Sequence, residues 1–122
     1  MTAQTVNRIT TRLRPTLLDK LGLVDAIEWE VEEFEDRTGI KCKLTVEPEG
    51  MEVDRDRSTA IYRIVQEALT NIARRAQATK SAVSLKMSDG RLHLSIAVIF
   101  EINGIKKRGT KIVVIIPIEN LG

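Results

Sequence analysis

The spacing of apolar residues predicts a helical segment at the start of the chain. From Leu17 to Phe34 apolar residues recur every three or four positions, which places them on one face of an α-helix. Pro15 suits the first turn of this helix, and Gly39 suits its end, because glycine accepts the left-handed conformation beyond a helix terminus. Gly22 interrupts the run. We therefore expect one amphipathic helix with a bend, or two helices that separate at Gly22.

A strand and a second helix are expected next. Lys41–Glu47 alternates polar and apolar residues, as a half-buried strand does, and Pro48–Gly50 ends it. Asp54 or Asp56 can cap a helix by accepting hydrogen bonds from its free backbone amides. The apolar spacing then continues at helical intervals to about Ala76.

The remainder of the chain alternates with a period of two, which is typical of strands. Ser81 begins one strand, Asp89–Gly90 suits a tight hairpin turn, and Leu92–Ile96 forms the partner strand. Gly109–Ile118 is rich in β-branched residues and is expected as an inner strand, after a loop at residues 103–108. This order predicts an α+β two-layer sandwich, with a mixed sheet of four to five strands packed on two to three helices.

Composition narrows the class of protein only slightly. A chain of 122 residues that is 43% hydrophobic fits one domain. The net charge is +2, with basic and acidic residues interspersed, so we expect neither nucleic-acid binding nor membrane contact. No apolar run is long enough to span a bilayer, and no signal-peptide pattern is present, so we expect a soluble domain. The single cysteine, Cys42, suits a reducing cytoplasm, where we expect the domain even if its parent protein is bound to a membrane. Cys42 and His93 are too few for a zinc or iron site.

One face of the second helix carries candidate chemistry. Glu67 and Asn71 are four residues apart and therefore lie on the same side of the helix, and Arg74 and Arg75 continue that side. An amide oxygen can help to hold Mg²⁺, a carboxylate can position a water, and guanidinium groups bind phosphate. This set suits a magnesium nucleotide, although the spacing alone is more often that of a solvated helix surface.

Two segments resemble the ATP-binding domain of bacterial sensor histidine kinases, which belongs to the GHKL ATPase family. Tyr62–Thr79 closely resembles the N box of that family. Leu13–Ile27 resembles the junction between the dimerisation helices and the ATPase domain in its nitrate-sensor-like subgroup. The resemblance implies that residues 1–16 end a linker or dimerisation helix and that residues 17–122 form the ATPase-like domain.

The resemblance also implies roles for individual residues, with Mg-ATP as the ligand. Glu67 corresponds to the water-polarising catalytic carboxylate, Asn71 to the magnesium ligand and Arg74 to a phosphate-contacting cation. Arg75 stands where the subgroup usually has histidine, beside the phosphates. The implied partners are the dimerisation and phosphoacceptor helices of a sensor kinase and, indirectly, a response regulator.

The strands of the C-terminal part extend the resemblance. Ser81–Ile96 is similar to the family's hairpin, and Lys111–Pro117 is similar to its last strand. Gly109 and Thr110 match the glycine-threonine turn that precedes this strand, which implies that they contact the nucleotide.

The chain departs from the family after Ala97. There the family carries an Asp-x-Gly-x-Gly box that binds adenine, a flexible lid and a second glycine-rich box, whereas this chain continues with Val98. We infer a deletion between Ala97 and Val98, whether by natural loss, by deliberate removal or by omission of a segment from the sequence. Without the glycine-rich backbone, the adenine-binding carboxylate and the lid, Mg-ATP binding is expected to be impaired. His93 lies on a predicted strand, so the phosphoacceptor histidine must come from elsewhere.

Two other interpretations remain open. The chain could be a non-enzymatic interaction module that pairs with another subunit, for example in a homodimer. Val98–Phe100 and Ile112–Ile116 would then provide an exposed apolar surface for this contact. It could also be an anti-sigma or chaperone-type ATPase of the same fold, which the segment Leu13–Ile27 disfavours.

Overall fold

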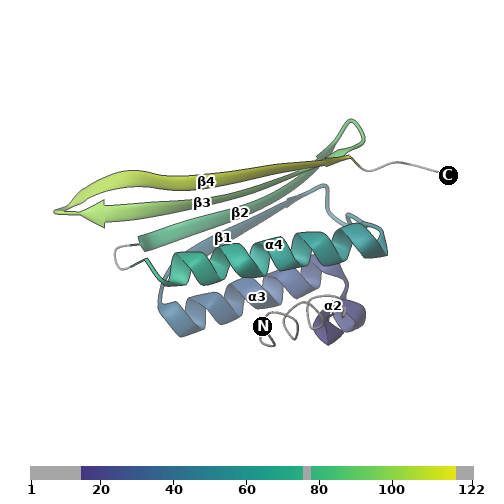
Figure 1. Cartoon of the computed structure of the whole chain (residues 1–122), viewed down its shortest axis with the longest axis horizontal. Helices are drawn as coiled ribbons and strands as arrows, with labels where there is room; N and C mark the ends of the chain where they lie inside the picture. The colour runs from purple at the N-terminus through teal and green to yellow at the C-terminus, as the bar shows by residue number, and fades with distance from the viewer. Residues whose placement is uncertain (1–14, 76–77, 118–122) are drawn as a thin grey trace, which may run out of the picture.

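The structure is a computed structural model that describes residues 15–75 and 78–117. Within these residues, helices cover one face of a four-stranded mixed sheet (Figure 1). The elements in chain order are α2 (Thr16–Leu21), α3 (Leu23–Thr38), β1 (Lys41–Glu47), α4 (Arg55–Ala73), β2 (Ala78–Ser88), β3 (Arg91–Ile102) and β4 (Ile105–Pro117). This arrangement confirms the predicted two-layer α+β sandwich. Most of the segment expected to end a linker helix, and the expected helix end at Ala76, lie outside the described residues.

Local signals in the sequence set the limits of the helices. Gly22 separates α2 from α3, so the second of the two expected alternatives, two separate helices, is confirmed. Gly39 ends α3 in the left-handed conformation, with a φ of 76°, and donates its amide to the carbonyl of Glu35. The Glu35 side chain in turn accepts a hydrogen bond of 2.8 Å from the amide of Cys42 at the start of β1. The end of the helix is therefore tied to the first strand.

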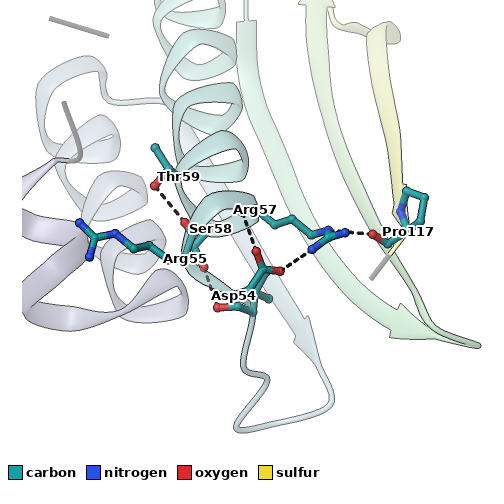
Figure 2. Close-up of polar contacts among 7 residues, drawn as sticks. Asp54, Arg55, Arg57, Ser58, Thr59 and Pro117 are labelled. Atoms are coloured by element: carbon teal, nitrogen blue, oxygen red, sulfur yellow. Dashed lines mark hydrogen bonds and ion pairs between the residues drawn. The ribbon is translucent and has the colours of Figure 1, made fainter. Parts of the chain in front are cut away.

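Asp54 caps α4 and joins it to the end of the sheet. Its carboxylate accepts a 3.1 Å bond from the Arg57 amide and a 2.9 Å bond from the Arg57 guanidinium (Figure 2). Arg57 Nε donates to the carbonyl oxygen of Pro117, the last residue of β4, at 2.8 Å (Figure 2). The expected N-terminal cap is thus Asp54 rather than Asp56, and it fixes the position of the C-terminal end of β4 relative to α4.

Replacing Asp54 with alanine is expected to lower the free energy of unfolding by about 1 kcal/mol, because the first turn of α4 loses its cap. The hydrogen bond from the Arg57 side chain holds the pKa of Asp54 below its usual value. The carboxylate therefore stabilises the fold above its unfolded-state pKa, and this contribution is lost as the pH falls through the lowered pKa. Urea unfolding near neutral pH checks the first effect, with Asp54→Asn as a control that keeps an acceptor oxygen. An unchanged stability in Asp54→Ala would contradict this account of the cap.

The core lies between the helices and one face of the sheet. The strand order is β1-β2-β3-β4, with β1 and β2 parallel and the other neighbours antiparallel. Alternate residues of β2 and β3 point to the helices and are buried, namely Val83, Leu85, Leu92, Leu94, Ile96 and Val98. They meet the apolar stripes of α3 and α4, which include Ile27, Val31, Phe34, Ile61, Val65 and Leu69. Cys42 is also buried, as expected, and burial raises the pKa of its thiol.

Three predictions for the C-terminal part are wrong. Lys106 and Lys107 lie in β4 and not in a loop, because Asn103–Gly104 alone makes the hairpin turn with positive φ at both residues. The segment after Gly109 is the edge of the sheet and not an inner strand. Gly109 and Thr110 do not form a turn but lie inside β4.

The interior of the β3–β4 hairpin contains a β-bulge. Ala97 pairs with Lys111 and Ile99 pairs with Arg108, so Val98 faces two residues of β4, Gly109 and Thr110. Ala97 and Val98, between which the deletion was inferred, are consecutive residues inside the continuous strand β3. Beyond this point the hairpin extends past the end of α4 (Figure 1).

Candidate functional site

A groove runs along α4 where the helix faces the edge of the sheet. One part has a volume of about 360 Å³ and is lined by Arg63, Ile64, Glu67, Ala68, Asn71 and Ile112. An adjoining part of about 220 Å³ is lined by Ala68, Asn71, Ile72, Arg75, Ile96, Val98 and Ile112. Because both parts share Ala68, Asn71 and Ile112, they form one continuous depression, which we call the α4–β4 groove.

The groove exists because the helices do not extend over β4. Ile96 of β3 is buried beneath α4, whereas its partner Ile112 on β4 shares the same face of the sheet and is 38% exposed. Val114 and Ile116, which follow Ile112 on that face, are only partly buried. One side of the groove is thus the polar flank of α4, and the other is an aliphatic strand.

Three predicted site residues line this groove. Glu67 and Asn71 are exposed and lie one turn apart on α4, as their spacing predicted. Arg75 follows at the enclosed end, where its guanidinium carbon lies 5.8 Å from the centroid of the Phe100 ring. That distance suits a cation–π contact, which directs the charge of Arg75 to this end of the groove.

The other three predicted site residues lie elsewhere. Arg74 is the C-cap residue of α4 and is exposed, and it is not among the residues that line the groove. Gly109 lines a separate hollow of about 200 Å³ with Ser95, Ala97, Ile99 and Lys111, on the sheet face opposite to the helices. Thr110 lies in β4 beside Gly109, and its side chain is outside the described part of the structure.

Arg63 and Ile112 also line the groove, although neither was among the predicted site residues. Arg63 lies one turn before Glu67 on the same flank of α4, so the spacing of four that linked Glu67 with Asn71 also identifies it. Ile112 lies on the opposite wall of the groove. No local sequence pattern predicts its contact with α4, because the two are far apart in the chain. The groove therefore holds guanidinium groups at both ends of an acid and an amide.

The residues of the groove are suited to a ligand that brings its own negative charge. Arg63 and Arg75 supply cations, and Ile64, Ala68 and Ile112 provide an apolar surface. Among the described residues there is no group of three or more His, Cys, Asp or Glu side chains that could hold a metal ion. A magnesium ion at Asn71 and Glu67 would thus need oxygen ligands from phosphate and water, as is common for this ion.

Comparison with known proteins points to signalling kinases. No protein-family model matches the chain. It is similar to the sensor histidine kinase MctS of Rhizobium johnstonii, with 37% identity over 92 residues, which is 75% of this chain and 20% of that protein. The chain thus spans about a fifth of the length of this relative. In the described ranges, no helix has both the length and the apolar character needed to cross a membrane. The similarity indicates that the chain is a domain related to sensor histidine kinases.

Proposed function

We propose that the chain is a reduced ATP-binding domain of a two-component sensor histidine kinase, and that the α4–β4 groove is the remaining part of its nucleotide site. One observation carries the proposal: Glu67, Asn71 and Arg75, which the N-box resemblance identified, line one groove together with Arg63. The similarity to a sensor histidine kinase supports the same class of protein.

In this proposal each residue has a chemical role. Asn71 offers its amide oxygen to Mg²⁺, whose other positions are taken by phosphate oxygens and water. Glu67 accepts a hydrogen bond from one of these waters and positions it. Arg75 and Arg63 bind phosphate oxygens by charge-assisted hydrogen bonds. The aliphatic groups of Ile64 and Ile112 provide surface on which a nucleobase can lie.

Two features support the proposal that the nucleotide binds weakly. The groove is open, and β3 runs directly from Ala97 through Val98 into the hairpin with no glycine-rich loop to enclose phosphates. His93 lies on β3 and pairs with Lys86, away from the groove. The acceptor of a phosphoryl group is therefore a histidine on separate dimerisation and phosphoacceptor helices, and a response regulator receives the group afterwards. With these partners, the proposed location of the domain is the cytoplasm.

Calorimetric titration with Mg-ATP tests the proposal. We expect a dissociation constant in the millimolar range, with binding that depends on Mg²⁺. Asn71→Ala is expected to weaken it about tenfold, the effect of losing one charge-assisted contact.

Thr70→Ala is the matched control, because Thr70 precedes Asn71 on α4, is exposed and does not line the groove. Micromolar affinity would contradict the claim that the site is impaired. An absence of binding at millimolar concentration, or an equal loss in both variants, would contradict the claim that the groove binds the nucleotide.

A further inference from the structure

The outer edge of β4 is open for pairing. Among the residues that the structure describes, β4 pairs only with β3, so its other side presents backbone N–H and C=O groups with no partner strand. Such an edge is a template for another strand unless charges, proline or bulges obstruct it. The two halves of β4 differ in this respect.

The first half of β4 is obstructed by basic residues and by a bulge. Lys106 and Lys107 are exposed, and Arg108 follows them in the sequence. The bulge at Gly109–Thr110 interrupts the regular spacing of the backbone groups. Lys111 adds a further exposed cation. A second strand that paired here would lie beside these basic side chains, and its backbone N–H and C=O groups would not match the spacing at the bulge.

The second half, Ile112–Ile116, carries none of them. Every residue of this segment is β-branched and aliphatic. Ile112 is 38% exposed on the face toward the helices, whereas Val113 and Ile115 are 54% and 53% exposed on the opposite face. The segment therefore offers an open backbone edge with apolar side chains on both faces of the sheet, and Arg57 holds its C-terminal end through Pro117.

We propose that a second copy of this chain pairs with this edge, in antiparallel orientation and centred on Val114. In this register Ile112 lies opposite Ile116 and Val113 lies opposite Ile115. On each face of the sheet, aliphatic side chains of one copy therefore pack against aliphatic side chains of the other. The proposal does not rest on nucleotide binding, although Ile112 takes part in both the groove and the proposed interface.

Charge selects this orientation and register. In the proposed pairing the basic halves of the two β4 strands point away from each other, to opposite ends of the interface. Pairing centred on Lys106–Lys111 would place cations opposite cations, and parallel pairing would bring the two basic halves side by side. The apolar segment is also symmetric about Val114, as a two-fold interface requires.

The geometry permits the pairing. A two-fold axis perpendicular to the sheet keeps the helices of both copies on the same side and makes the two sheets continuous. Because α4 packs on β2 and β3 and Ile112 of β4 stays 38% exposed, no helix of the described residues stands between the two edges. Ile112 and Ile116 of both copies then become buried on the sheet surface between the two α4 helices.

Sedimentation equilibrium of the full chain, up to millimolar concentration, tests the proposal. The expected result is a concentration-dependent rise from the monomer mass to twice that mass. Val113→Lys is expected to abolish the rise. Ile105→Lys, which changes an aliphatic residue that is 60% exposed at the other end of β4, is expected to leave it unchanged. A monomer at all concentrations, or dimers of equal strength in Val113→Lys, would overturn the proposal.

Disulfide trapping tests the register. Only Val114 lies opposite its own copy, so Val114→Cys is expected to form a covalent dimer under mild oxidation, whereas Ile105→Cys is not. The native Cys42 is buried and serves as the background in the unchanged chain. Equal cross-linking of both variants, or none in Val114→Cys, would overturn the register, and with it the pairing proposed here.

Discussion

Tyr62→Phe is expected to lower the free energy of unfolding by about 1.5 to 3 kcal/mol, the range for a hydrogen bond to a charged group. Tyr62 is 2% exposed, and its hydroxyl donates a 2.5 Å bond to Glu30 Oε1. Gln66 donates a second, longer bond of 3.1 Å to the same oxygen. These bonds connect α4 to α3. The phenylalanine variant keeps the ring in the core but leaves the Glu30 carboxylate with only one of these donors.

The same contact predicts a loss of stability at alkaline pH. Burial, the hydrogen bond to Glu30 and the charge of Glu30 all raise the pKa of Tyr62 above its ordinary value of 10.0. The folded state therefore keeps the proton that the unfolded chain releases. Its stabilising contribution is complete below the unfolded pKa and is lost as the pH rises toward the raised pKa.

Tyr62 is the only tyrosine of the chain, so phenolate absorbance reports on this residue alone. We expect no phenolate signal at about pH 10, the ordinary tyrosine pKa, while the protein remains folded. Urea unfolding on either side of this pH should show a smaller decrease of stability in Tyr62→Phe than in the unchanged chain. Ionisation of Tyr62 at its ordinary pH in the folded protein would contradict the contact with Glu30.

Gly109→Ala is expected to destabilise the protein by about 1 to 3 kcal/mol, as overpacking does. A Cβ atom at Gly109 would lie 2.0 Å from Cε2 of Phe100 and 2.7 Å from Cγ1 of Val98. The Phe100 ring must then move, which also disrupts its contact with Arg75. In the absence of this clash, alanine would instead stabilise the protein by about 0.4 to 1 kcal/mol, because it lowers the conformational entropy of the unfolded chain. Chemical denaturation distinguishes the two signs.

A double-mutant cycle locates the cause. In a Phe100→Ala background the cost of Gly109→Ala should fall, because the nearest atom is gone, although Val98 keeps part of the clash. Equal costs in both backgrounds would show that Phe100 is not the obstacle. This result bears directly on why glycine occupies position 109, which the resemblance had assigned to a nucleotide-binding turn.

The local part of the fold could be predicted from the sequence. Gly22, Gly39 and Asp54 act on the backbone within a few residues of themselves, so their effect on helix ends is visible in the chain alone. The α+β class follows from the order of elements in the same way. The position of β4 at the edge of the sheet could not be found, because β-branched residues occur in inner and edge strands alike.

The candidate site could also be predicted from the sequence only in its local part. Glu67 and Asn71 share one helix flank, which the spacing of four residues specifies. The opposite wall depends on which strand lies beyond the helices, so Ile112 became visible only in the fold. Gly109 was placed wrongly because a bulge and a turn both favour glycine, and only the pairing of β3 with β4 distinguishes them.

The central claim is that the α4–β4 groove binds a magnesium nucleotide. Its most direct test is a titration of the isotope-labelled chain with Mg-ADP, followed by the backbone amide signals in NMR spectra. The expected shifts grow without saturation below millimolar concentration and are concentrated at Arg63, Glu67, Asn71, Arg75 and Ile112. Shifts confined to the opposite face of the sheet, around Ser95 and Lys111, would contradict it.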